Sequence, residues 1–151
     1  MKSNKVACIG VLYPSMKVFS KYYFESLESQ SFKDFDLILN DDGYILDNGI
    51  IPKASNNIIV TKFKGTPTTI RLKLFQYVVS MNYEYIIFTD TDDTIAPNRV
   101  EISYNYLNTH DHFINELNII DENNLLIEKN YLSNRITNNS QIIINNIFHY
   151  N

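Results

Sequence analysis

The chain has 151 residues and a mass of 17.6 kDa; 44% of its residues are hydrophobic, 20% are charged, and the formal net charge is −4. This length fits one globular domain that can fold without a disulfide or a structural metal, and the acidic balance excludes a general nucleic-acid binder. No apolar run reaches the roughly 18 residues of a membrane span. The single cysteine, Cys8, cannot form an internal disulfide, so a cytoplasmic location is expected.

The first half of the chain alternates between strand-like and helix-like patterns. Residues 5–13 form a short apolar run, which predicts a strand buried on both faces. From Ser15 to Gln30, apolar residues recur at helical spacing, and this predicts an amphipathic helix. A second strand is expected over residues 35–40 and a third over residues 58–63, with a loop rich in Asp, Asn, Gly and Pro between them.

The second half of the chain continues the alternation. Thr66 and Pro67 are a capping residue and a first-turn proline, so a helix is expected to begin there. The elements expected after it are a strand over residues 85–89, a helix from Pro97, a hairpin of strands 112–120 and 125–128, and a strand over residues 141–148. This order predicts one α/β domain over residues 1–151 with a mainly parallel sheet.

Two acidic clusters directly follow predicted strands. Asp41 and Asp42 close the second strand, and the acidic loop Asp90–Asp93 closes the fourth. In open α/β sheets, ligands bind beyond the carboxyl ends of the strands. Crowded carboxylates raise one another's pKa unless a cation lies between them, so the loop predicts a divalent ion, Mg²⁺ or Mn²⁺, whose other ligands include substrate phosphates. One such cluster alone would be interpreted as a solvated helix cap; two at neighbouring strand ends favour the metal site.

The two clusters belong to an ordered series of short motifs in the first 108 residues. In chain order these are Tyr13 after the first strand, SLESQSF at residues 26–32, DDG at residues 41–43, Gly65 before a helix that carries Arg71, and FTDTDD at residues 88–93. Together they resemble the family 2 glycosyltransferases. The resemblance implies the GT-A fold, a Rossmann-like α/β/α sandwich, with residues 1–108 as the nucleotide-sugar-binding core and residues 109–151 as a partial acceptor-side region.

The resemblance also implies roles for the residues that bind the nucleoside. Asp42, or Asp41 beside it, would accept a hydrogen bond from the base of a nucleoside diphosphate sugar, most often a UDP-sugar. Tyr13, at the end of the first strand, would touch this base. Asp90 would lie near the ribose.

A second set of implied roles concerns the diphosphate. Asp92, together with Asp93, would hold the divalent metal against the diphosphate, and Arg71 would add a cationic contact. Fixed cations of this kind neutralise the charge that develops on the leaving diphosphate. The implied reaction is transfer of the sugar, with inversion, to a glycan, lipid or protein acceptor. Peripheral membrane association, the oligomeric state and the catalytic base stay open; Asp121 and Glu122 are weak candidates for the base.

Two other functions compete with this interpretation. The chain is also compatible with a nucleotide-sugar-binding fragment or subunit that lacks the acceptor half and does not catalyse transfer. The stretch from Asp90 to Asp93 after an apolar strand also fits the nucleophile motif of haloacid-dehalogenase-type phosphatases, in which the first Asp attacks phosphorus. In those enzymes the motif follows the first strand and needs a downstream lysine, for which only Lys129 is available, so this function ranks lower.

Overall fold

The computed structural model describes residues 6–45, 55–123 and 125–135. By its internal contacts the chain divides into two compact units, Met1–His112 and Phe113–Asn151, which we call unit 1 and unit 2. The sequence places its expected boundary close by, after residue 108, and the grouping of both parts into one domain stays a prediction. The strand expected over residues 141–148 lies outside the described residues.

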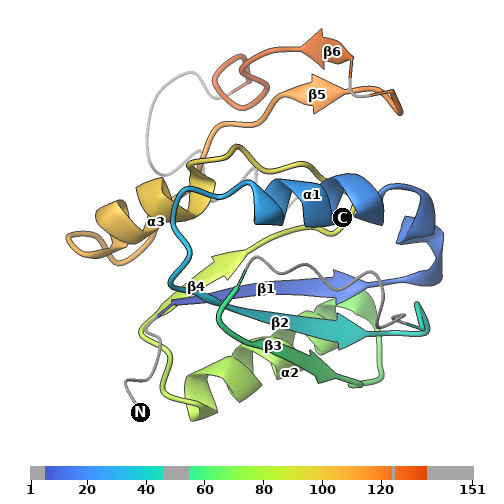
Figure 1. The fold of residues 1–151 in the computed structure, drawn as a ribbon, viewed down its shortest axis with the longest axis vertical. Helices are drawn as coiled ribbons and strands as arrows, with labels where there is room; N and C mark the ends of the chain where they lie inside the picture. The colour runs from blue at the N-terminus through green and yellow to red at the C-terminus, as the bar shows by residue number, and fades with distance from the viewer. Residues whose placement is uncertain (1–5, 46–54, 124, 136–151) are drawn as a thin grey trace. The chain divides into compact units, whose positions relative to one another are not determined.

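The centre of unit 1 is a parallel four-stranded sheet in the order β3-β2-β1-β4 (Figure 1). Its strands are β1 (Val6–Leu12), β2 (Asp36–Asp41), β3 (Ile58–Thr61) and β4 (Tyr85–Phe88). All four therefore confirm the sequence prediction, with ends that differ by at most two residues. Because the strands are parallel, with Leu12 opposite Asp41 and Ile9 opposite Phe88, their carboxyl ends share one edge of the sheet.

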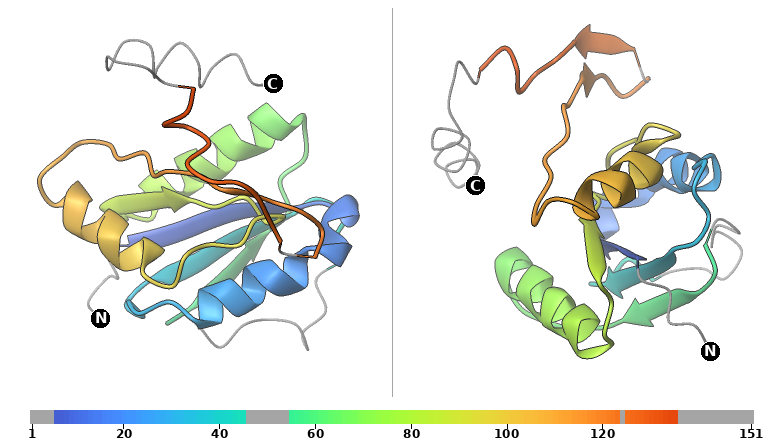
Figure 2. Two further views of the ribbon diagram at one scale, coloured as in Figure 1. Left: turned by 90° about the horizontal axis from the view of Figure 1, so that it is seen from above. Right: turned by 90° about the vertical axis from the view of Figure 1, so that its left-hand side faces the viewer.

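Helices cover both faces of this sheet. The helices α1 (Ser20–Glu28) and α3 (Arg99–Leu107) lie on one face, and α2 (Pro67–Ser80) lies on the other (Figures 1 and 2). Unit 1 is thus an α/β/α sandwich, as the sequence predicts.

Each helical layer has its own buried core. Successive side chains of a strand point to opposite faces, so β1 contributes to both cores. Cys8 and Leu12 pack in the core that contains Leu27 of α1, whereas Ile9 packs in the core that contains Leu74 of α2. Burial raises the pKa of the Cys8 thiol to about 12, so this cysteine is an inert core residue.

The first helix is shorter than its periodicity predicts. A helix from Ser15 is expected, but Pro14–Val18 form a 3-10 helix, η1, and α1 begins only at Ser20. The reason is that η1 buries none of its residues, so no apolar face supports an α-helix there.

The start of α2 confirms its prediction, because the side chain of Thr66 accepts a hydrogen bond from the N–H of Thr69. None of the helices among the described residues is long and apolar enough to cross a membrane.

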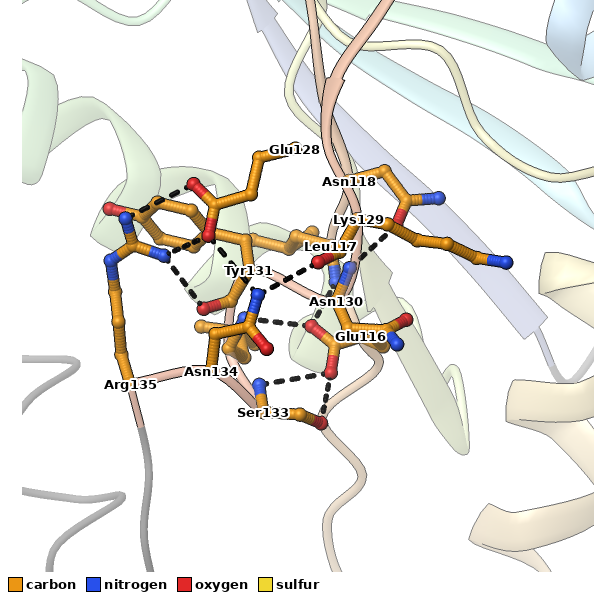
Figure 3. A network of polar contacts seen from close by, with 11 residues as sticks. Glu116, Leu117, Asn118, Glu128, Lys129, Asn130, Tyr131, Ser133, Asn134 and Arg135 are labelled. Carbon is orange, nitrogen blue, oxygen red and sulfur yellow. Dashed lines mark hydrogen bonds and ion pairs between the residues drawn. The ribbon is translucent and has the colours of Figure 1, made fainter.

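Unit 2 contains an antiparallel hairpin of β5 (Ile119–Ile120) and β6 (Leu126–Glu128). The hairpin is predicted correctly, but the expected first strand over residues 112–120 is reduced to its last two residues. The preceding segment is joined to the chain after the hairpin by one backbone bond, from the N–H of Tyr131 to the carbonyl of Leu117 at 2.8 Å, and by its own Glu116 side chain. The carboxylate of Glu116 accepts hydrogen bonds from three backbone N–H groups, those of Leu117, Leu132 and Ser133 (Figure 3).

A second carboxylate anchors the chain that follows this hairpin. Arg135 donates to both oxygens of Glu128, at 2.6 and 3.1 Å. The guanidinium of Arg135 also lies 3.7 Å from the centre of the Tyr131 ring, a cation–π contact (Figure 3). The described part of unit 2 is therefore organised around two carboxylates, the exposed Glu116 and the half-buried Glu128, and has little regular structure.

Candidate functional site

A crevice of about 300 Å³ opens at the carboxyl edge of the sheet in unit 1. It is lined by Val11, Tyr13, Met16, Arg71, Asp90, Thr91, Asp92 and Asp93. Five of the predicted site residues are thus brought together, whereas Asp41 and Asp42 are not part of the lining. The volume is at the lower end of the range for small-molecule sites, roughly 300–1,000 Å³.

Buried threonines fix the acidic loop Asp90–Asp93 against β1. The N–H and the hydroxyl of Thr89 both donate to the carbonyl of Ile9, at 2.9 and 3.0 Å. The hydroxyl of Thr91 donates to the carbonyl of Val11 at 2.7 Å. Thr89 and Thr91 are buried, and the alternating residues Asp90 and Asp92 are exposed. The loop therefore continues the line of β4 and presents its carboxylates outward.

A glycine allows this close approach. A Cβ at Gly10 would lie 3.0 Å from Cγ2 of Thr91, 3.1 Å from the carbonyl oxygen of Thr89 and 3.2 Å from the hydroxyl of Tyr23. That hydroxyl is itself hydrogen-bonded to Thr89, at 2.8 Å. Any larger residue at position 10 would push the acidic loop away from β1.

The SLESQSF motif supports the far end of the same loop. The hydroxyl oxygen of Ser26 accepts the N–H of Ile95 at 3.2 Å. The buried side chain of Gln30 donates to the carbonyl of Ala96 at 2.8 Å and accepts the N–H of Val100 at 3.0 Å. The sequence identifies this motif. Its role as a support for the acidic loop cannot be read from the sequence, because it depends on contacts between segments that are far apart along the chain.

The charges of the crevice are only partly paired. Nη2 of Arg71 lies 2.9 Å from Oδ1 of Asp90. Within the described part of the chain, Asp92 and Asp93 form no ion pair. Partial desolvation, with smaller contributions from the carboxylates of Asp92 and Asp90, raises the pKa of Asp93 to about 6. The crevice therefore combines one cation with carboxylates that lack a counter-charge, a setting that favours binding of a further cation.

Tyr13 places a polar group without a partner beside these charges. Its hydroxyl oxygen is buried, and it has no hydrogen-bond partner among the described residues. Desolvation is the main reason that the pKa of Tyr13 is raised; Arg71 opposes the shift, while Asp42 and Asp90 add to it. The hydroxyl is thus within electrostatic reach of both acidic clusters, although Asp42 does not line the crevice.

The two aspartates after β2 have different surroundings. Oδ1 of the buried Asp41 accepts the N–H groups of Gly43 and Ile45, both at 3.1 Å, and so shapes the loop. The backbone N–H of Asp42 is fixed by the carbonyl of Leu12 at 2.9 Å, and its side chain is partly exposed. Of the pair, Asp42 has the carboxylate that suits contact with a ligand.

The fit of a divalent cation can be assessed from the available oxygen atoms. Within the described residues, no group of three or more His, Cys, Asp or Glu side chains is arranged to hold a metal ion. Asp92 and Asp93 could supply two carboxylates, so phosphate and water oxygens would have to complete the coordination. Mg²⁺ is commonly held in this way, by one or two carboxylates and substrate phosphates.

Asp121, considered as a catalytic base, belongs to unit 2. Its Oδ1 accepts the N–H groups of Asn123 and Leu125, both at 2.8 Å. These bonds, first the one from Leu125, lower the pKa of Asp121. The carboxylate therefore shapes the hairpin turn, and its low basicity does not suit proton abstraction.

Comparison with known proteins connects this geometry to a fold. No protein-family model matches the sequence, and no curated protein sequence matches it. The structure is similar to a crystal structure of residues 1–349 of TarS from S. aureus, with a TM-score of 0.52, 20% sequence identity and coverage of 71% of this chain and 33% of that one. A longer TarS structure from S. aureus gives a TM-score of 0.50, 20% identity and coverage of 71% and 20%.

TarS is a glycosyltransferase. The chain has the GT-A fold. The fold expected from the sequence is thereby confirmed. At 20% identity the similarity shows the fold alone, and the chain spans a third or less of the length of the TarS structures.

Proposed function

We propose that unit 1 binds a nucleoside diphosphate sugar, with UDP as the nucleotide, and acts as the donor-binding part of a glycosyltransferase of family 2 type. The observation that carries the proposal is the crevice at the carboxyl edge of the sheet, where Arg71 and the acidic loop Asp90–Asp93 line one space. The negative diphosphate would neutralise the Arg71 guanidinium, and a cation bound to the diphosphate would neutralise the carboxylates of the acidic loop. The GT-A fold supports the proposal because glycosyltransferases with this fold bind their donor at this edge of the sheet.

Each group of the donor would have its own contacts. The base would lie by Asp42 and Tyr13, and the ribose near Asp90. Asp92 and Asp93 would hold Mn²⁺ or Mg²⁺, and this ion would neutralise charge on the diphosphate. The guanidinium of Arg71 would release Asp90 and donate a hydrogen bond to a phosphate oxygen instead.

The proposed reaction transfers the sugar to a glycan, lipid or protein hydroxyl with inversion. The acceptor oxygen forms a bond to the anomeric carbon, the bond from that carbon to the diphosphate breaks, and a carboxylate base on the acceptor side takes the hydroxyl proton. The chain's own contribution is to hold the leaving diphosphate in place and to offset its developing charge. The base itself has no assignment in unit 1 or unit 2.

Calorimetry of the full chain with UDP tests this proposal. We expect UDP to bind with Mn²⁺ present and to bind at least about tenfold more weakly without it, since Arg71 alone leaves most of the diphosphate charge uncompensated. Asp92→Asn should abolish the effect of Mn²⁺. The matched control is Asp111→Asn, which alters an exposed aspartate outside the crevice and should leave binding unchanged.

Binding and transfer can be measured separately. If UDP binds with the expected dependence on Mn²⁺ but the chain releases no UDP from a UDP-sugar, the chain is a nucleotide-sugar-binding part without transfer activity. If UDP does not bind, or if Mn²⁺ strengthens UDP binding to the Asp92→Asn variant as much as it does for the wild type, the assignment of the crevice is wrong.

A further inference from the structure

An ion pair lies at the carboxyl end of β2, outside the lining of the crevice. Nζ of Lys64 lies 2.8 Å from Oδ1 of Asp42. The Asp42 side chain is 22% exposed and the Lys64 side chain 67% exposed. An ion pair this exposed contributes little to folding stability, because ordering a long lysine side chain offsets most of the attraction. Stability alone therefore does not explain the pairing.

The backbone before Lys64 is held by a buried amide. Asn40 is fully buried at the end of β2. Its Oδ1 accepts the N–H of Phe63 at 2.6 Å and the hydroxyl of Thr61 at 2.9 Å, and its Nδ2 donates to the carbonyl of Phe63 at 3.2 Å. One side chain thus satisfies both polar backbone groups of Phe63, which directly precedes Lys64.

The backbone of Lys64 is also fixed from the other side. Its carbonyl oxygen accepts a hydrogen bond from Nζ of Lys73, on α2, at 2.9 Å. Gly65 then turns the chain with a φ of +149°, a conformation that only glycine adopts readily. Thr66 caps α2 immediately afterwards. Contacts on both sides therefore place Lys64 beside Asp42.

We propose that Lys64, paired with Asp42, completes the recognition of the base and selects a ring N–H that is flanked by a carbonyl group, as in uracil. This inference rests on the proposed function. The Asp42 carboxylate would accept the ring N–H, and the Lys64 ammonium would donate to the adjacent carbonyl oxygen. Both bonds are charge-assisted, which makes them stronger than neutral hydrogen bonds.

The same pair disfavours cytosine. The ribose and diphosphate are fixed by the crevice, so the ring nitrogen at position 3 stays opposite the same protein groups. Uracil carries a proton on that nitrogen and a carbonyl at position 4, whereas cytosine has a bare nitrogen that repels a carboxylate and an amino group that opposes an ammonium. Such a mismatch weakens binding, because it leaves buried or half-buried polar groups without hydrogen-bond partners.

The affinities of the full chain for UDP and CDP, measured by calorimetry with Mn²⁺, test the inference. The wild-type chain should bind UDP at least about tenfold more tightly than CDP. Lys64→Met should weaken UDP binding and reduce this preference to less than about threefold. Lys62→Met is the matched control, since Lys62 is an exposed lysine two residues away, and it should keep the wild-type preference.

Three outcomes separate the possibilities. If Lys64→Met keeps the preference for UDP, Lys64 does not recognise the base and the inference is wrong. If Lys64→Met binds UDP more tightly than the wild type, Lys64 merely competes for Asp42, and the inference is again wrong. If the wild type binds neither nucleotide, the proposed function itself fails. Thermal unfolding of Lys64→Met at the wild-type temperature would show that the variant is folded.

Discussion

The hydroxyl of Thr91 donates a 2.7 Å hydrogen bond to the carbonyl of Val11. This bond joins the acidic loop to the end of β1, because Thr91 stands between Asp90 and Asp92. It is buried, so neither group can turn to water if the other is removed. The two strand ends that contribute residues to the crevice are therefore linked by a side chain that is itself no part of the proposed chemistry.

Replacing Thr91 with valine should destabilise unit 1. The change keeps the shape of the side chain but leaves the Val11 carbonyl without its donor, and we expect a loss of about 1–2 kcal/mol in the free energy of unfolding. Urea denaturation measures this loss. Thr94→Val is the control, because Thr94 is exposed and should change stability by less than about 0.5 kcal/mol. Equal stability of the two variants would contradict a structural role for the bond.

Tyr13→Phe should separate stability from binding. The Tyr13 hydroxyl is buried without a hydrogen-bond partner in the described part of the chain. Its removal should therefore leave the free energy of unfolding unchanged or raise it by up to about 1 kcal/mol. If the nucleotide supplies the missing partner, UDP affinity should fall by about three- to tenfold. Calorimetry and thermal unfolding of the same sample measure both effects; an unchanged affinity would mean that the ligand does not reach Tyr13.

Arg71→Gln should affect ligand binding far more than stability. The pair between Arg71 and Asp90 is exposed, at 53% and 60% of the two side chains, so its loss should cost less than about 1 kcal/mol in unfolding free energy. A phosphate contact is charge-assisted, and its loss should weaken UDP binding by about tenfold or more. Calorimetry with UDP and urea denaturation of the same variant measure these two effects.

The control for Arg71→Gln is Lys21→Gln. Lys21 forms a comparable exposed pair with Glu25 of α1, at 3.7 Å, and lies outside the crevice lining. Its loss should change neither UDP affinity nor stability measurably. If both variants bind UDP like the wild type, Arg71 makes no contact with the diphosphate.

The sequence predicts the fold of unit 1 well because its strands are short, apolar and covered on both faces. β1 and β2 are buried along their whole length, so their hydrophobic runs carry the signal directly. The segment around Glu116 is predicted poorly, since it is joined to residues 131–133 largely through the Glu116 side chain, which accepts the N–H groups of Leu132 and Ser133. Periodicity cannot reveal hydrogen bonds to a side chain that is distant along the chain.

The candidate site is predictable to the extent that its residues belong to short motifs. The acidic loop and Arg71 follow from motif order, and the alternation of Thr89 and Thr91 with the aspartates could have indicated their inward direction. The sequence does not indicate Lys64, because a single lysine in a loop belongs to no motif or periodic pattern. Its place beside Asp42 depends on the clamp that the buried Asn40 forms on Phe63.

Glu116 allows a pH-dependent prediction in unit 2. Its carboxylate accepts a hydrogen bond from the Ser133 hydroxyl and three from backbone N–H groups, and these bonds lower the pKa of Glu116 from 4.5 to about 2. Because the folded-state pKa is the lower one, the charged form stabilises the loop fully above pH 4.5, and this stabilisation is lost as the pH falls towards 2. The Ser133 amide resonance should follow this titration with a midpoint near 2.

Glu116→Gln should remove the titration. A neutral amide oxygen accepts the same N–H groups more weakly, so the Ser133 amide resonance of the variant should stay at one position, displaced from that of the wild type at neutral pH, throughout the acid range. Glu122→Gln, at an exposed glutamate of the hairpin turn, should retain the wild-type titration. A wild-type midpoint near 4.5, the value of a free glutamate, would show that the carboxylate does not hold these backbone groups in solution.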